Sequence, residues 1–546
     1  MNLPWASRTP QQDKPLIVTL FVTLSQFRTS LAVVLATLAF LVPLAAQAQI
    51  ASLDKGHQIL IDRSLQISGV IALTSDPFHL STMQAGGFTK PQWAWTSDVS
   101  TLGAVPGAPW SRWVDYVNEN DLTSAEQPYK SSLVQLSVGD EQDIVNDPGV
   151  RAATTAWFNY NRAKFPGTIL SINRPAGDGS AAEATSTANW IAEAQPDMIT
   201  FDWYPFNYNA TLDPNFPNRK WNWYWYSVGQ RYRRQALGAS IGATFGTAGN
   251  APRPYGTYLQ TYKTAPAPDE DKRAPSDSEM RLQTFAALTM GYTDLSCFTY
   301  NSGSSTLFDP PSAGDTSPGP GYYQFKETAR QAHNLGPALT RLISKGSGTR
   351  FVAGRNSANT ANNPLPLDWK GWAAGSEGDP YITSIAATNL GTTNGGQRGD
   401  VLIGYFSPLL EAYDGLDYSN ELYFMMTNGL SDPAGLVGDC RQQITVSFDF
   451  KTSGISSLLR LSRDTGLVEQ VPLTFDGTTR YHLSLTLDGG SGDLFKFNDG
   501  APFVGFYVPE PSALWLLALP AALLFFRRGP SMRSHPPRAG CYARLM

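Results

Sequence analysis

Cysteine and histidine are scarce in this chain of 546 residues, which has three Cys and five His. Cys297, Cys440 and Cys541 are too few and too scattered for a disulfide framework, and no Cys/His spacing is typical of a zinc site. A glycine-rich phosphate loop is also missing after the first strand-like run, which argues against nucleotide binding. We therefore expect no metal and no cofactor.

Basic residues are in the minority once the two ends of the chain are set aside. Residues 1–48 hold three basic residues and one acidic residue, and residues 509–546 hold five and one. The remainder has 33 Lys+Arg against 44 Asp+Glu, a net charge of −11. Because phosphate backbones need a basic footprint, this acidic body argues against nucleic acid as a partner.

Long apolar runs are confined to the two ends. The first, Leu31–Leu44, follows scattered basic residues and leads to Ala46-Gln47-Ala48, a small-x-small cleavage pattern. This combination predicts a signal peptide over residues 1–48 and a mature N-terminus near Gln49.

The second run, Ala513–Phe526, ends at Arg527-Arg528. As a helix it reaches only about 21 Å, short of the roughly 30 Å hydrocarbon core, so we do not expect a stable span. Together with the preceding Pro509-Glu510-Pro511, it resembles the PEP-CTERM sorting signal of Gram-negative bacteria. Over residues 508–528 that resemblance implies an exosortase-type processing partner, transient inner-membrane attachment, and export to the cell surface or extracellular matrix. Residues 529–546 follow as a basic tail.

Between residues 49 and 345, apolar runs alternate with amphipathic segments. Strand-like runs cover 66–73, 88–95, 133–138, 168–173, 197–203, 239–245 and 293–300. Helices are expected over 109–117, 150–165, 181–194, 221–236, 276–290 and 322–342. This alternation predicts an α/β fold with a parallel sheet and helices outside. Without a phosphate loop to favour an open doubly wound sheet, we expect a (β/α)8 TIM barrel, with the missing eighth strand or an irregular sector in 96–132.

Residues 346–507 have a different pattern. The helical periodicity ends, and short alternating runs appear between turn residues, at 400–406, 421–426, 443–450, 457–461, 481–487 and 494–497. This pattern predicts an all-β sandwich. We expect it to pack against the barrel and to lengthen the substrate surface.

Polar residues follow four of the predicted barrel strands. They are Asp140-Glu141, Asn173-Arg174, Asp202-Trp203-Tyr204 and Tyr300-Asn301, and Trp95 ends a further strand. The carboxyl ends of barrel strands meet at one rim. Carboxylates, amides and aromatics at one rim are what glycosidic cleavage requires, with one acid to protonate the leaving oxygen and a second carboxylate to attack or to activate water.

Glu141 is the candidate general acid. Its neighbour Asp140 is expected to raise the pKa of Glu141 by like-charge repulsion, as is partial burial. The alternative is that both acids cap the following helix, whose N-terminus favours anions.

Three segments resemble retaining barrel glycosidases of clan A, especially the β-galactosidase-like branch. They are Val138-Gly139-Asp140-Glu141, Phe201-Asp202-Trp203-Tyr204-Pro205 and Glu279–Tyr300, within residues 60–345. The resemblance implies a (β/α)8 barrel with its acid/base after strand four, which matches Glu141, and a nucleophilic Glu at the end of strand seven. The run 239–245, however, continues into Gly246-Thr247-Ala248 without an acid.

Two other acids are candidates for the second carboxylate. Asp202 stands at a strand end among aromatic residues, and its alternative role is a hydrogen-bonded anchor of the rim. Glu279 lies in Ser276-Asp277-Ser278-Glu279, which also matches a capping box. Arg174 is a candidate either for binding a carboxylated sugar or for pairing with Asp140.

We therefore expect an exported glycoside hydrolase that acts on a cell-surface or extracellular polysaccharide. The alternative is a non-catalytic carbohydrate-binding or matrix-structural protein on a degenerate barrel, and a lyase or transglycosylase is a third hypothesis. The distance from Glu141 to the nearest rim acid discriminates: about 5–5.5 Å for retention, about 6.5–9.5 Å for inversion, and binding alone if no acid lies within about 10 Å.

Overall fold

The computed structural model describes residues 53–506 apart from short internal segments. The longest of these are 73–77, 116–121, 209–218, 239–251, 265–271, 355–364 and 410–420. The predicted signal peptide, sorting segment and basic tail lie outside the described residues, as do Trp95 and the strand expected over 239–245. Within the described part, no helix is both long and apolar enough to cross a membrane.

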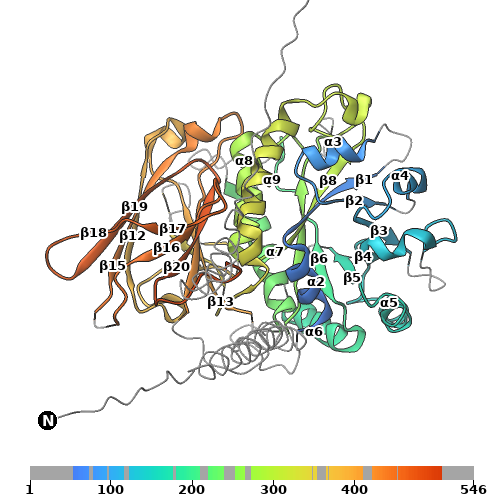
Figure 1. The fold of residues 1–546 in the computed structure, drawn as a ribbon, viewed down its shortest axis with the longest axis horizontal. Coiled ribbons are helices and arrows are strands. Elements are labelled where there is room, and N and C mark those ends of the chain that lie inside the picture. Colours follow the sequence, from blue (N-terminus) through green and yellow to red (C-terminus); the bar gives the residue numbers. More distant parts are fainter. Residues whose placement is uncertain are drawn as a thin grey trace, which may run out of the picture.

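Eight parallel strands close into a barrel (Figure 1). They are β1 (Gln66–Ile71), β2 (Lys90–Trp93), β3 (Trp110–Val114), β4 (Leu133–Val138), β5 (Ile169–Arg174), β6 (Met198–Phe201), β7 (Tyr255–Gln260) and β8 (Asp294–Asn301). Strand β1 pairs with both β2 and β8, which closes the ring. The predicted barrel is confirmed.

One predicted helix is wrong. Strand β3 occupies the middle of 109–117 and supplies the strand missing from 96–132. Trp110 and Val114 pack with the helical shell, whereas Trp113 joins a cluster inside the barrel. The apolar spacing of Trp110, Trp113 and Val114 matches a helix because polar Ser111 and Arg112 stand between them. Both are nevertheless buried in the strand, where Arg112 pairs with Glu126. Strand β7 likewise lies after the run expected to form it.

Helices cover the outside of the barrel. They are α2 (Lys55–Arg63), α3 (Leu80–Ala85), α4 (Val99–Ala104), α5 (Pro148–Arg162), α6 (Ala181–Ala194), α7 (Arg219–Ala236), α8 (Asp277–Met290) and α9 (Pro320–Leu339). Asp147, Ser180 and Ser276 begin α5, α6 and α8 because their side chains accept hydrogen bonds from the first-turn backbone. The long predicted helices other than 109–117 are present.

Two sheets follow the barrel. The larger contains β9 (Leu342–Ser344), β10 (Arg350–Val352), β11 (Lys370–Gly371), β13 (Val401–Pro408), β14 (Tyr423–Asn428), β16 (Leu458–Leu461), β17 (Val468–Val471) and β20 (Gly492–Phe497). The smaller contains β12 (Ile382–Asn389), β15 (Gln442–Asp449), β18 (Thr474–Phe475) and β19 (Arg480–Leu487). The strand pairs of both sheets are antiparallel except for β10 with β11. The six predicted runs all contain strands, and the sandwich is confirmed.

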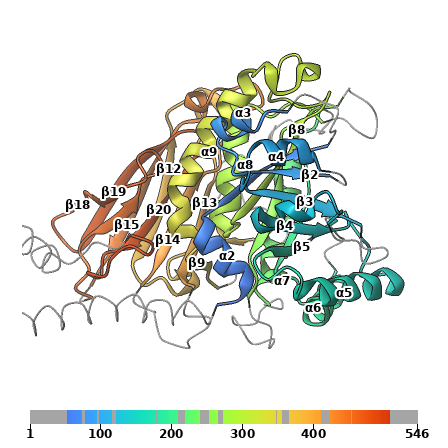
Figure 2. The ribbon, with the colours of Figure 1, turned by 45° about the vertical axis from the view of Figure 1, so that its right-hand side comes forward.

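The larger sheet is shared between the sandwich and the barrel. Figures 1 and 2 show α8 and α9 between the barrel strands and this sheet. In β13, Val401 and Ile403 face the core between the two sheets, whereas Leu402 and Phe406 belong to the core formed with the barrel. Strand β13 is therefore buried on both faces.

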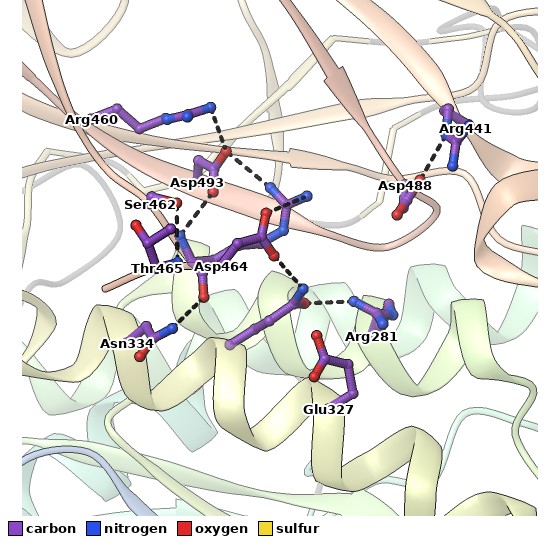
Figure 3. A network of polar contacts seen from close by, with 12 residues as sticks. Arg281, Glu327, Asn334, Arg441, Arg460, Ser462, Asp464, Thr465, Asp488 and Asp493 are labelled. Carbon is purple, nitrogen blue, oxygen red and sulfur yellow. Dashed lines mark hydrogen bonds and ion pairs between the residues drawn. The ribbon is translucent and has the colours of Figure 1, made fainter. Parts of the chain in front are cut away.

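A polar network joins α8 and α9 to the sandwich at one edge of this contact (Figure 3). Arg281 Nη1 donates to Gln331 Oε1 at 2.5 Å, and Gln331 Nε2 donates to Asp464 Oδ1 at 2.7 Å. The neighbouring Arg463 pairs with Asp493 at 2.9 Å. These polar and charged contacts lie beside the apolar contact between the larger sheet and the two helices. They hold the sheet against α8 and α9.

Candidate active site

The turn after β4 presents two adjacent carboxyl groups. Gly139 and Glu141 have positive φ angles, 61° and 50°. A positive φ is unfavourable for a residue with a side chain. Two hydrogen bonds hold the turn: Gln142 Nε2 donates to Asp140 O at 2.7 Å, and Arg174 Nη1 donates to Gln142 O at 2.6 Å. The turn leaves Glu141 exposed and Asp140 half-buried.

Asp202, directly after β6, lies against these groups. Its carboxyl group is in hydrogen-bonding contact with that of Glu141 and close enough to Asp140 and Asn173 for both to affect its pKa. Asn173 Nδ2 donates to Asp140 Oδ1 at 2.9 Å, while Thr200 Oγ1 donates to Asn173 Oδ1 at 3.3 Å. The ends of β4, β5 and β6 thus bring three carboxyl groups and one amide together.

Burial and the neighbouring negative charges both raise the pKa of Asp202. Desolvation raises the pKa of Asp202 well above 3.8, and the charges of Glu141 and Asp140 raise it further, whereas the Asn173 amide lowers it. Burial also raises the pKa of Asp140. Asp202 Oδ1 is buried and has no hydrogen-bond donor among the described residues.

Aromatic rings lie beside the acids. Tyr204 Oη is 3.4 Å from Asp202 Oδ2, and the Tyr204 ring stacks on Phe298 with centroids 5.5 Å apart. Lys272 Nζ lies 5.5 Å from the centroid of Trp203 and donates to Tyr204 O at 2.8 Å. Trp203 and Tyr204 are partly exposed. Partly exposed aromatics around a few convergent polar groups are typical of ligand sites.

Tyr258 of β7 faces the same acids from inside the barrel. Its Oη accepts hydrogen bonds from Gln92 Nε2 at 2.8 Å and from Trp113 Nε1 at 3.0 Å. These two donors use the acceptor capacity of the phenol, so its own O–H is left to donate elsewhere. Burial raises the pKa of Tyr258, and the charges of Asp140 and Asp202 raise it further. The O–H is thus left as a donor within electrostatic reach of Asp140 and Asp202.

Six predicted site residues gather at this rim: Asp140, Glu141, Asn173, Asp202, Trp203 and Tyr204. Neither Asp140 nor Glu141 caps the next helix, because Asp147 occupies the N-cap of α5. The capping alternative for the two acids is therefore wrong.

Arg174 lies on the outer side of β5 and does not pair with Asp140. Its side chain is 2% exposed and, like Ile172 two residues earlier, alternates away from the barrel interior. It is close enough to Tyr232 of α7 to affect that pKa, and it holds Gln142 as described above. The expected pairing with Asp140 is wrong, and Arg174 supports the turn rather than contacting a bound sugar.

Glu279 has a structural position. It forms the capping box of α8 with Ser276, its two carboxylate oxygens accept from Arg273 at 2.5 and 2.6 Å, and its side chain is fully buried. Glu279 therefore caps α8, as the alternative interpretation stated, and its interpretation as a catalytic residue is wrong.

Two further candidates are also buried. Tyr300 and Asn301 end β8 with no exposed surface, and Tyr300 Oη lies 3.5 Å from Asp315 Oδ2. Neither reaches a bound substrate directly, which corrects the prediction that they contact it. Strand β7 ends in Gln260, a buried amide bonded to the backbone of Phe206 and Arg273 rather than an acid.

The sequence did not point to Tyr258, Gln92 or Trp113. Gln92 has no signal in the sequence, because it follows Thr89, Lys90 and Pro91 in the expected strand. Trp113 lies in the segment predicted to be a helix, and Tyr258 lies after the run predicted to form its strand. Within the described residues, no group of three or more His, Cys, Asp or Glu is arranged to hold a metal ion.

No protein-family model and no curated protein matches this chain. Similar solved structures include a GH2 β-galacturonidase from Eisenbergiella tayi (11% identity, TM-score 0.32, covering 49% of this chain and 51% of that one). A GH27 β-L-arabinopyranosidase from Geobacillus stearothermophilus has 8% identity and a TM-score of 0.35, covering 83% of this chain and 99% of that one. AbfB, a family 51 α-L-arabinofuranosidase from Bifidobacterium longum, has 9% identity and a TM-score of 0.33, covering 80% of this chain and 96% of that one. This chain thus spans about half the length of the first. All three are glycoside hydrolases, but at these TM-scores the likeness carries no argument, and the fold rests on the strand topology.

Proposed function

We propose that the protein is a glycoside hydrolase whose two working carboxyl groups are Asp202 and Glu141. The observation that carries the proposal is the contact between these groups together with the raised pKa of Asp202. Glycosidic cleavage needs one protonated and one ionised carboxyl group. Like-charge repulsion between two carboxyl groups in contact favours the state in which one is protonated and the other is ionised.

In this proposal Asp202 is the general acid and Glu141 is the carboxylate that attacks or activates water. Asp202 is the more buried of the two, and the neutral form is favoured there. These roles reverse those expected from the sequence, in which Glu141 held the proton.

Sugar binding has to separate the pair. Carboxyl groups in contact are closer than the roughly 5–5.5 Å of retaining enzymes or the roughly 6.5–9.5 Å of inverting ones. Glu141 is the group able to move, because its side chain is exposed, whereas Asp202 is packed beside Tyr204. Asp140, Asn173 and Trp203 are then left to contact the sugar.

The substrate proposed is a cell-surface or extracellular polysaccharide. This part rests on the sequence, namely on the signal-like residues 1–48 and the sorting-signal resemblance of 508–528. The contact of Glu141 with Asp202 favours hydrolysis over the binding-only alternative, which was motivated by the missing acid at the end of strand seven.

The test compares Asp202→Asn and Glu141→Gln on a panel of 4-nitrophenyl glycosides and on the matching alkyl glycosides. Asp202→Asn should lower hydrolysis of the alkyl glycosides by roughly 10²–10⁴-fold and should affect the activated aryl glycosides much less. Glu141→Gln should impair both classes. Asp143→Asn, an exposed acid in the same loop, is the matched control and should keep wild-type rates. Hydrolysis of every substrate by both variants at the wild-type rate would refute the assignment.

A further inference from the structure

A second polar arrangement lies on the same rim, at β1 and β8. Asp315 belongs to the 3-10 helix η3 (Pro311–Thr316), which follows β8, and His79 immediately precedes α3, which follows β1. Asp315 Oδ1 is 2.7 Å from His79 Nδ1, and Asp315 Oδ2 accepts from the backbone N–H of His79. One carboxylate thus holds both the ring and the backbone of the histidine.

Asp315 is buried, whereas His79 is exposed. The Asp315 side chain is 0% exposed and that of His79 is 57% exposed. Behind them, Tyr300 Oη lies 3.5 Å from Asp315 Oδ2, and Phe78 packs edge-on against Tyr300. The buried residues fix the orientation of an imidazole that projects into solvent. Tyr300, which was predicted to touch substrate, lies against Asp315 instead.

This orientation determines what His79 offers to a ligand. A carboxylate at Nδ1 keeps the proton on that nitrogen and leaves Nε2 facing outward. Nε2 accepts a hydrogen bond when the ring is neutral and donates one when the ring is charged. A hydroxyl group pairs with both forms because it both donates and accepts. A carboxylate ligand pairs only with the charged form, and it also meets the negative charge of Asp315 beside the ring.

The geometry points to His79, oriented by Asp315, as a second glycan contact that binds a hydroxyl group on a sugar unit away from the cleaved bond. This inference rests on the proposed function. In the strand order, β1 and β8 lie across the ring from β4 and β5, and an eight-stranded barrel is about 15 Å across. A single sugar at the carboxyl cluster does not reach that far, whereas an oligosaccharide does.

The experiment uses 4-nitrophenyl galactosides with one and with three galactose units, in both anomers, as the probes. His79→Ala should leave kcat/KM for the one-unit substrate within about twofold and lower it about 3–10-fold for the three-unit substrate, through KM, as expected for one lost hydrogen bond. His79→Gln should restore part of the loss. Ser81→Ala, an exposed change on α3, should have no effect. Equal losses on both lengths would show a structural role and overturn the inference, as would no loss on either.

Calorimetric binding of the three-unit galactosides separates this inference from the proposed function. If the wild type hydrolyses none of them but binds one, and His79→Ala weakens that binding, the proposed function fails for these substrates and the His79 contact stands. Binding that is unchanged in His79→Ala, or no binding at all, overturns the His79 contact.

Discussion

Arg174 Nη1 donates a 2.6 Å hydrogen bond to the carbonyl oxygen of Gln142, the residue after Glu141. Because Glu141 has a positive φ, its conformation depends on how firmly the turn is held at the next residue. Arg174 is thus a positioning residue for Glu141, although it lies on the opposite side of β5 from the acids.

We expect Arg174→Met to lower kcat/KM on a hydrolysed aryl glycoside by about 10–100-fold, which corresponds to one charged hydrogen bond of about 1.5–3 kcal/mol. Arg151→Met is the control, since Arg151 pairs with Glu193 between α5 and α6. Steady-state kinetics and the melting temperature are measured together. Wild-type kcat/KM in Arg174→Met, or a loss shared by Arg151→Met, would contradict this role.

The raised pKa of Asp202 predicts a pH-dependent difference in stability. The folded protein binds the Asp202 proton more tightly than the unfolded chain does, so this stabilisation is complete below the ordinary Asp pKa of about 3.9 and is lost as pH rises toward the folded value. Asp202→Asn should therefore gain stability relative to wild type as pH rises above about 4. Urea unfolding at several pH values measures the difference, and a gap that does not change with pH would exclude the effect.

Tyr258→Phe removes the acceptor shared by Gln92 and Trp113 as well as the O–H close to the acids. We expect the melting temperature to fall, because two buried donors lose their partner, and kcat/KM to fall about tenfold. Trp113→Phe removes one donor but keeps the phenol, so it should lower the melting temperature with a smaller loss of activity. Equal activity losses in both variants would mean that the O–H has no role of its own.

Gly404 of β13 lies directly against α8. A Cβ at this position would stand 1.9 Å from Thr289 O, so Gly404→Ala has to push the sheet away from the helix. We expect a loss of about 1–3 kcal/mol or more in the free energy of unfolding. Gly167→Ala is the control, because no atom lies within 4 Å of the added Cβ there. Chemical unfolding measures the free energy of unfolding of both variants. Equal values would show that β13 and α8 can move apart to accommodate the added methyl group at Gly404 without a loss of stability.

The sequence predicted the parts of the fold that have a local signal. Helices α5 to α9 have clear amphipathic periodicity or caps, and β4 is an apolar run that stops at Gly139. Strand β3 differs from the predicted helix because buried Ser111 and Arg112 give its apolar residues a helical spacing. Strand β7 lies later than predicted because Tyr255–Gln260 is neither a continuous apolar run nor a clean alternation.

In the candidate site, too, only the residues with a local sequence signal were predictable. Asp140, Glu141 and Asp202 were predictable because each follows a recognisable strand end. The contact of Gln92 with Tyr258 joins residues 166 positions apart in the chain, and the hydrogen bond from Arg174 to Gln142 joins two strand ends 32 positions apart. Such relationships across the barrel leave no trace in local periodicity.

Helix α8 is shared between the barrel and the sandwich, so the chain cannot be divided cleanly between them. Its residues from Ser278 to Met290 are all buried, because the barrel lies on one side and the larger sheet on the other. A fragment that stops near residue 345 would leave one side of this helix facing water, with Leu282 and Phe285 among the side chains left partly uncovered. The sandwich is therefore not a removable module: trimming the chain to the barrel for expression, or grafting another accessory domain in its place, would have to rebuild the surface of α8 first.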